Sequence, residues 1–278
     1  MSTPAVPVGI IPPRPAWRSL RWIAPLTLLW IAVMYWLPAI PGSGFQTTAH
    51  QLVAQMFMAL GLWLGLERTD LTLSQRRATW LVILVAHALW FAVVWSAAIH
   101  GVFRLSAVPP PLPMLPLAIF LPVMVGAPLL LLSKRVGQVL DAMPAAWLIA
   151  LQFYRVFGSW AIAAWLHGAM AGVDALPAGT GDLLTGLFAV PAAIAVASGT
   201  AQGRKVAIAW NLFGLADFAV AVTLGMITAP GRFQLIAPDM PSLNAGTWPY
   251  VLTPAFVVPS SILLHALSLR QLFRRRAA

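Results

Sequence analysis

Residues 76–99 read RRATWLVILVAHALWFAVVWSAAI, which is two arginines followed by an uncharged and largely apolar run. A run of about 20 apolar residues is long enough to cross the hydrocarbon core of a bilayer as a helix. The same pairing of cations with long apolar runs recurs on both sides of this segment. This arrangement predicts an all-α, polytopic bundle of transmembrane helices.

The Lys and Arg residues alternate with pairs of apolar stretches. They form five groups: Arg14, Arg18 and Arg21; Arg68, Arg76 and Arg77; Lys134 and Arg135; Arg204 and Lys205; and Arg270, Arg274, Arg275 and Arg276. Loops rich in Lys and Arg stay in the cytoplasm, so every group and both termini are predicted to lie inside. Arg104 and Arg232 are the outer exceptions, and Arg155 lies within an apolar stretch.

The composition agrees with a membrane protein. The chain is 60% hydrophobic and 9% charged, whereas a soluble domain has roughly 25% charged residues. Its net charge of +10 is spread over the membrane edges, which favours anionic lipid headgroups at the cytoplasmic face as partners and not nucleic acid. The absence of cysteine excludes disulfides and thiolate metal sites.

Eight spans satisfy all the charge groups. They are predicted at 22–40, 51–66, 78–103, 112–132, 145–170, 183–200, 206–228 and 250–269. Residues 1–16 are proline-rich and are predicted to form a disordered cytoplasmic tail. Residues 17–276 then form one transmembrane domain, and prolines in its helices at Pro122, Pro128, Pro191, Pro254 and Pro259 are expected to make them irregular.

A faint internal repeat divides this domain into halves at 17–140 and 141–276. Polar residues stand seven positions after a tryptophan in both halves: His87 follows Trp80, and Asp217 follows Trp210. A tandem duplication of four helices would make His87 and Asp217 equivalent, related by an axis along the membrane normal. Chance resemblance between apolar sequences is the alternative.

Two charges lie deep in the predicted spans, Arg155 and Asp217. Each is about 15 Å from the cytoplasmic end of its helix, at 1.5 Å per residue, and the two helices run in the same direction. A charge at this depth costs on the order of 3 kcal/mol and usually faces the bundle interior. We therefore predict that Arg155 and Asp217 pair, with Gln152 and Asn211 nearby, as a functional site or a structural clasp.

Other chemistry-bearing residues give weaker signals. His50, His100 and His167 fall near outer helix ends together with Asp174 and Asp182, but they lack metal-ligand spacing, and no metal is predicted. His87 and His265 lie at different depths, which argues against a bis-histidine haem, and no cofactor is expected. Asp182 follows Gly179-Thr-Gly181 and is predicted to cap the helix at 183–200, with an outer-mouth carboxylate as the alternative.

A chain of short motifs runs through the second half. It consists of Gln152-Phe-Tyr-Arg155-Val-Phe-Gly158, Gly181-Asp182, Trp210-Asn211-Leu-Phe-Gly214, Ala229-Pro230, Phe256-Val-Val-Pro259 and His265-Ala-Leu-Ser268-Leu-Arg-Gln271. This order resembles a group of uncharacterised bacterial integral membrane proteins over about residues 147–271. The resemblance implies an inner-membrane protein without indicating an activity, and Asp217 is not part of the shared pattern.

The predicted function is transport of a small solute through a polar site between the fifth and seventh helices. The candidate site residues are Arg155, Asp217, Gln152, Asn211, Asp182, His265 and His87. A non-catalytic scaffold, sensor or assembly partner is the first alternative. A membrane-embedded enzyme is the second, although no acid–base cluster is evident, so catalysis is not the favoured interpretation.

The charge pattern yields a test of orientation. Reporter fusions after residues 105 or 178 are expected to report a periplasmic location, and fusions after 70, 136, 203 or 276 a cytoplasmic one. An external C-terminus would remove one span and contradict the architecture.

Overall fold

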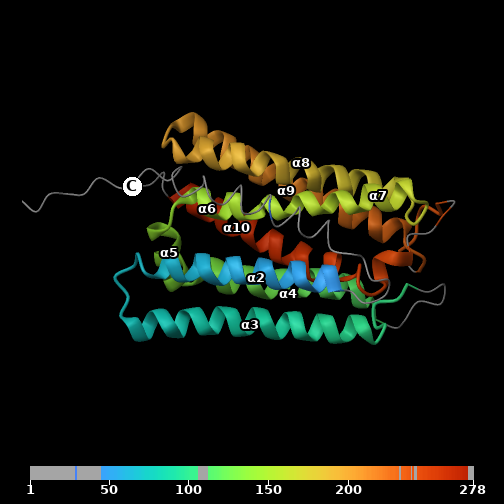
Figure 1. Ribbon diagram of the computed structural model, residues 1–278, viewed down its shortest axis with the longest axis horizontal. Coiled ribbons are helices and arrows are strands. Elements are labelled where there is room, and N and C mark those ends of the chain that lie inside the picture. Colours follow the sequence, from blue (N-terminus) through green and yellow to red (C-terminus); the bar gives the residue numbers. More distant parts are fainter. Residues whose placement is uncertain are drawn as a thin grey trace, which may run out of the picture.

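The computed structural model describes residues 29, 45–105, 112–231, 233–238, 240 and 243–274, and these ranges contain helices and no strands. The predicted tail at 1–16, the predicted span at 22–40 apart from residue 29, and Arg232 lie outside the described residues. The long helices run side by side along the longest axis of the molecule (Figure 1). The predicted all-α fold is confirmed.

The first half of the described chain contains α2 (Phe45–Leu66), α3 (Leu73–Ile99), α4 (Met114–Leu132) and α5 (Lys134–Ala142). Thr72 caps α3: its hydroxyl accepts from the Gln75 amide at 3.3 Å, and the Gln75 side chain accepts from the Thr72 amide at 3.0 Å. This reciprocal capping box begins α3 within the turn that carries the predicted cytoplasmic cations.

The second half contains a broken helix and three longer helical segments. The elements are α6 (Ala145–Leu151), the 3-10 helix η1 (Gln152–Ser159), α7 (Trp160–Leu166), α8 (Gly172–Ala197), α9 (Ala201–Thr228), the 3-10 helix η2 (Leu243–Gly246), the π-helix η3 (Thr253–Val257) and α10 (Val258–Arg274). Among the five prolines expected to make helices irregular, only Pro254 and Pro259 lie at an irregular place, the junction of η3 and α10. Helix α4 continues past Pro122 and Pro128, and α8 continues past Pro191.

Six helical segments are long and apolar enough to cross a membrane: Thr47–Leu66, Leu73–Ile99, Met114–Leu132, Gly172–Ala197, Ala201–Thr228 and Thr253–Arg274. A seventh is reached if Lys134–Ala142 and Ala145–Leu166, which are bent by 95° relative to each other, count as one span. The chain is therefore a multi-pass membrane protein.

Two of the predicted helices need correction, one in its starting residue and one in its continuity. The predicted helix at 183–200 begins at Gly172, because the segment Ala178-Gly-Thr-Gly181 is helical and is not a loop. Residue 178 therefore lies inside α8, and the outer reporter fusion belongs between α7 and α8. The predicted continuous helix at 145–170 is interrupted by η1, whose residues include no proline.

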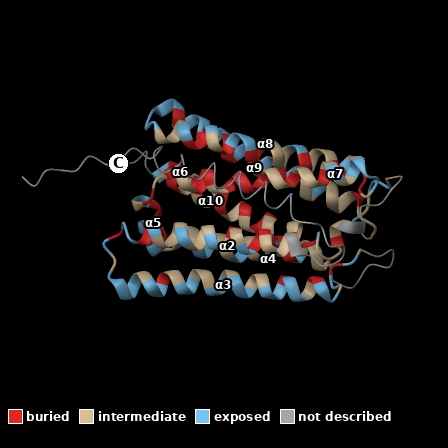
Figure 2. Ribbon diagram, viewed as in Figure 1, coloured by how far each residue is buried: buried red, intermediate tan, exposed pale blue. Residues whose placement is uncertain are grey.

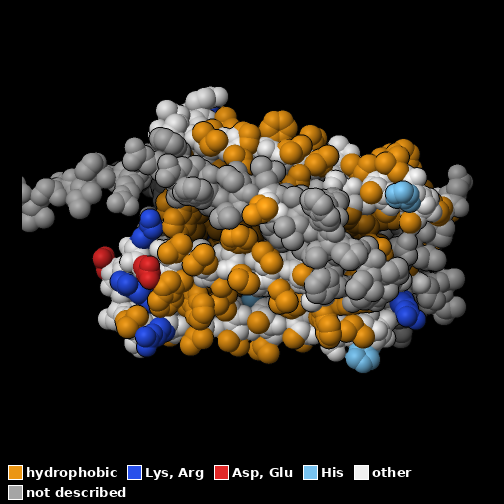
Figure 3. All heavy atoms as spheres, in the orientation of Figure 1, with side chains coloured by type: hydrophobic (Ala, Val, Ile, Leu, Met, Phe, Trp, Pro, Cys, Tyr) orange, Lys and Arg blue, Asp and Glu red, His pale blue; other side chains and the backbone are white. Residues whose placement is uncertain are grey.

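The outer surface of the bundle is apolar, as lipid contact requires. Large apolar side chains on α3 and α4 are strongly exposed, including Val82 at 70% and Leu132 at 80%. Buried residues concentrate between α6, α8, α9 and α10 (Figure 2). Lys and Arg side chains gather at the end of the bundle that carries α5, in agreement with the predicted cytoplasmic end (Figure 3).

Helix α10 lies at the centre and packs against α4, α6 and α9, while α5 crosses the end of the bundle. The buried face of α5 carries Val136, Val139 and Leu140, and Lys134 and Arg135 are exposed. α8 packs closely along α9, whereas α2 and α3, their predicted equivalents in the repeat, contact one another much less. The tandem repeat stays a prediction.

Candidate functional site

A single buried arginine forms the centre of the candidate site. Arg155, on η1, is 3% exposed. Its Nε donates to Asp182 Oδ1 of α8 at 2.7 Å, and its Nη2 donates to Asp217 Oδ2 of α9. The guanidinium also stacks on the Phe218 ring, 3.8 Å from the ring centroid. Two carboxylates and an aromatic face thus hold one cation in the interior of the bundle.

The third nitrogen of the Arg155 guanidinium, Nη1, determines the protonation state of His265. Arg155 Nη1 donates to the Gly214 carbonyl at 3.4 Å and lies 3.0 Å from His265 Nε2. A guanidinium has no acceptor, so Nε2 must accept, and the proton of His265 must sit on Nδ1. That N–H then donates to Asn211 Oδ1 at 2.9 Å. His265 is therefore neutral in this arrangement.

Asn211 extends the network toward the end of the bundle predicted to be cytoplasmic. Its amide nitrogen donates to the Ala207 carbonyl at 2.8 Å and to the Ser268 hydroxyl at 3.1 Å. Since both amide donors are used, the amide oxygen faces His265, which agrees with the tautomer inferred from Arg155. Asn211, His265 and Ser268 are fully buried. The network joins η1, α8, α9 and α10 through side chains that specify one relative placement of these elements.

The charges in this network do not balance. One guanidinium faces two carboxylates, and the adjacent His265 is neutral, so the cluster carries one excess negative charge when both acids are ionised. An unbalanced charge at membrane depth is costly and attracts a proton or a cationic group. The Arg155 cluster, defined as Arg155, Asp182, Asp217, Asn211 and His265, is therefore suited to binding a proton or a cation.

Glycines give the backbones the close approach that this cluster needs. A Cβ atom on any of three glycines would overlap a side chain of the cluster: Gly158 against Asp182, Gly181 against Asp217, and Gly214 against His265 and Arg155. A fourth contact brings Gly186 against the backbone of η1. Gly158, Gly181 and Gly214 stand within the motifs of the second half of the sequence, close to polar residues, and this spacing is the sequence signal for their role.

The 3-10 geometry of η1 explains the spacing of its motif. A 3-10 helix has 3.0 residues per turn, so side chains three apart lie directly above one another. Gln152, Arg155 and Gly158 therefore share one face of η1. Gly158 on that face contacts Asp182, and Arg155 reaches the same carboxylate. A regular α-helix would rotate these three residues progressively away from α8.

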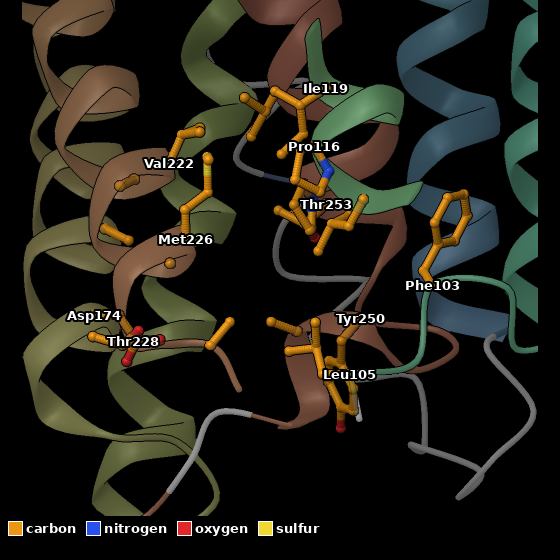
Figure 4. Close-up of a pocket in the computed structure, with 18 of the residues that line it drawn as sticks. Phe103, Leu105, Pro116, Ile119, Asp174, Val222, Met226, Thr228, Tyr250 and Thr253 are labelled. Atoms are coloured by element: carbon orange, nitrogen blue, oxygen red, sulfur yellow. The ribbon is translucent and has the colours of Figure 1, made fainter. Parts of the chain in front are cut away.

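A cavity of about 220 Å³ leads to the two carboxylates. Its walls are largely apolar and come from the outer halves of α8 and α9, the start of α4 and the η3 segment. Val222 and Met226 of α9 face Pro116 and Ile119 of α4 across it (Figure 4). Asp182 and Asp217 line its inner end, and the Asp182 side chain is 20% exposed. The cavity opens at the end predicted to lie outside.

Five of the seven candidate residues are thus brought together as the Arg155 cluster. Gln152 lies one 3-10 turn from Arg155, fully buried, and neither its amide nitrogen nor its oxygen has a partner among the described residues. His87 lies elsewhere, between Gln55 Oε1 at 2.7 Å and Ser260 Oγ at 3.0 Å. His87 and Asp217 therefore take part in different networks.

The interpretation of Asp182 as a helix cap is wrong. Asp182 lies inside α8, ten residues after its first residue, Gly172. Its carboxylate accepts a hydrogen bond from Arg155 and does not cap the amides at the start of a helix. The outer histidines also stay apart: within the described ranges no three His, Asp or Glu residues approach closely enough to hold a metal ion. His50 instead packs on Phe157, with ring centroids 4.3 Å apart.

Comparison with known proteins identifies a family. A family profile described as a domain of unknown function (DUF8737) matches residues 112–273. The chain belongs to this family. The DUF8737 region runs from α4 to α10, so it contains the whole Arg155 cluster and the cavity floor, whereas α2, α3 and His87 precede it. No curated protein and no solved structure matches the chain.

Removing the central cation should destabilise the DUF8737 region. Arg155→Ala leaves two buried carboxylates unpaired, and we expect it to lower the free energy of unfolding by about 3–5 kcal/mol. Adding Asp182→Asn and Asp217→Asn to Arg155→Ala should restore much of that loss, because the unpaired charges are gone. Unfolding in lipid–detergent micelles measures both effects. A loss below about 1 kcal/mol for Arg155→Ala would contradict the buried pairing.

The close packing at glycine can be tested within one helix. Gly214→Ala places a methyl group against His265 and Arg155, so the melting temperature should fall. Gly225→Ala, on the same helix, meets nothing within 4 Å and should leave it unchanged or raise it, since alanine favours helix by about 1 kcal/mol. Equal behaviour of the two variants in thermal unfolding would refute the close approach.

Proposed function

We propose that this protein is a transporter of the cell inner membrane and that it binds a small amphipathic organic cation in the cavity above the Arg155 cluster. The supporting observation is that Asp182 and Asp217 line the inner end of an apolar cavity while Arg155 neutralises only one of their two charges. An ammonium or amidinium group would supply the missing charge. An anion would meet two carboxylates and is disfavoured.

The cavity walls favour a ligand with an apolar body. Phe218, Val222, Met226 and Ile119 present apolar surface along the route to the acids. Ligand sites of this kind combine apolar walls with a few polar groups that fix orientation. A cation with a compact hydrocarbon portion would bury that portion against these residues and direct its charged end toward Asp182.

A cation bound at Asp182 would change the contacts of η1, the 3-10 segment that interrupts the helix. A cation that draws Asp182 away from Arg155 Nε removes one of the contacts that hold η1 against α8. Arg155 would retain Asp217, His265, the Gly214 carbonyl and Phe218 as partners. Broken helices at the membrane midplane commonly form the sites of secondary transporters. η1 is therefore the element that we expect to respond to the ligand.

A non-catalytic scaffold is the second candidate. The observation that favours it is that every nitrogen of the Arg155 guanidinium already has a partner, as in a purely structural clasp. A scaffold predicts that the carboxylates tolerate no ligand and that the cluster serves stability alone. Ligand binding separates the two functions.

The test is a thermal-shift screen of the purified protein in lipid nanodiscs. We expect some alkylammonium or arylammonium ions to raise the melting temperature by several degrees, and their neutral isosteres to leave it unchanged. Asp182→Asn should abolish the shift. Asp141→Asn, a matched carboxyl replacement outside the cavity at the Arg274 ion pair, should preserve it.

No shift with any cation, or the same shift for neutral isosteres, would contradict the proposed function. A shift that survives Asp182→Asn would place binding elsewhere. For a cation that does shift the melting temperature, uptake into proteoliposomes then tests transport directly.

A further inference from the structure

A further set of buried polar side chains, which shares Asn211 with the Arg155 cluster, lies on the opposite side of Arg155 from the cavity. Its members are all fully buried and come from four elements: Gln152, Thr185, Asn211, Ser268 and Gln271. Each stands toward the cytoplasmic end of its element relative to the residue that contacts Arg155. Thr185 follows Asp182 on α8, and Ser268 follows His265 on α10.

Several atoms of this set lack hydrogen-bond partners among the described residues. They are both amide atoms of Gln152, the Thr185 hydroxyl and the Gln271 amide oxygen. Leaving a buried polar group unsatisfied costs about 1–3 kcal/mol, and buried groups in native proteins are almost always paired, often with ordered water. Unpaired atoms on three side chains, Gln152, Thr185 and Gln271, therefore point to water in this region.

From these observations we infer that a hydrated path runs from the cytoplasmic end of the bundle to Arg155, along the buried polar face of α10. Ser268 and Gln271 follow His265 at intervals of three residues on that face, and Asn211 bonds both His265 and Ser268. Gln152 stands three residues before Arg155 on η1, Thr185 stands three residues after Asp182 on α8, and the two elements are in close contact at Gly186. Water molecules occupy this path and bond its unpaired polar atoms.

Helix α5 lies at the cytoplasmic end of the path. Gln271 Nε2 donates to the Leu140 carbonyl and, at 2.7 Å, to the Met143 carbonyl at the end of α5. Arg274 and Asp141 form an exposed ion pair at 3.1 Å between α10 and α5. These contacts fasten α5 across the bundle where the polar face of α10 ends (Figure 1).

The path and the cavity approach Arg155 from opposite sides. The cavity reaches Asp182 and Asp217, and the path reaches His265 and Asn211. Arg155 therefore separates the cavity from the path, and alternating access requires two such compartments on opposite sides of one site. The path goes beyond the proposed function, because water can occupy it whether or not the cavity binds an organic cation.

The chain contains no cysteine, so single cysteines can probe the path without background. Silver ion, in nitrate buffer, is about as small as water and reaches a thiol through a hydrated route. Thr185→Cys is the main probe, because the Thr185 hydroxyl has no partner among the described residues and its loss breaks no hydrogen bond there. Ser268→Cys is the second probe, on α10.

Ala189→Cys is the matched control on α8. Ala189 is also fully buried and lies one turn closer to the cytoplasmic end than Thr185, but it belongs to an apolar cluster. Ala201→Cys, at the exposed first residue of α9, reports which face of a sealed vesicle the silver reached. Thiols left unreacted are counted with a fluorescent maleimide after denaturation.

We expect Thr185→Cys and Ser268→Cys to react with silver from the face that modifies Ala201→Cys, at least tenfold faster than Ala189→Cys. If Thr185→Cys reacts no faster than Ala189→Cys, the unpaired groups are dry and the path does not exist. Reaction only from the opposite face would overturn its direction. Neither result depends on the cation screen, so failure of the proposed function remains distinguishable.

Discussion

The arrangement of this protein depends on keeping one guanidinium ionised in the interior of a membrane domain. Arg155 is almost fully buried, and bare exposure of its charge to lipid would cost several kcal/mol. Asp182, Asp217, His265 and the Gly214 carbonyl surround it, and these groups come from α8, α9 and α10. The hydrogen bonds that Arg155 needs therefore fix the placement of these three helices against η1.

The hydrogen bonds of Arg155 require the backbones of η1, α8 and α9 to lie close to the side chains of the cluster. Gly158, Gly181 and Gly214 each leave room for one polar side chain of the cluster, and a methyl group at any of them would occupy its place. The 3-10 geometry of η1 adds to this by aligning Gln152 with Arg155 and Gly158. The result is a polar centre with an apolar cavity on one side and unpaired polar groups on the other.

Much of the fold could be predicted from the sequence, because apolar run length and the placement of Lys and Arg are local signals. Equal depth on parallel helices also predicted that Arg155 and Asp217 meet. The role of Asp182 could not be predicted this way, since Gly179-Thr-Gly181 has the composition of a loop and becomes helical through packing against η1. The break at η1 could not be predicted either, because its residues include no proline.

The central claim is that two separate carboxylates hold Arg155 in the membrane. Solid-state NMR of the protein in lipid bilayers, with isotope-labelled arginine nitrogens and aspartate carboxyl carbons, measures these contacts through dipolar couplings. The account predicts a coupling to Arg155 Nε that disappears in Asp182→Asn and a coupling to Nη2 that disappears in Asp217→Asn. Spectra that neither substitution changes would show that Arg155 bonds neither acid and would contradict the account.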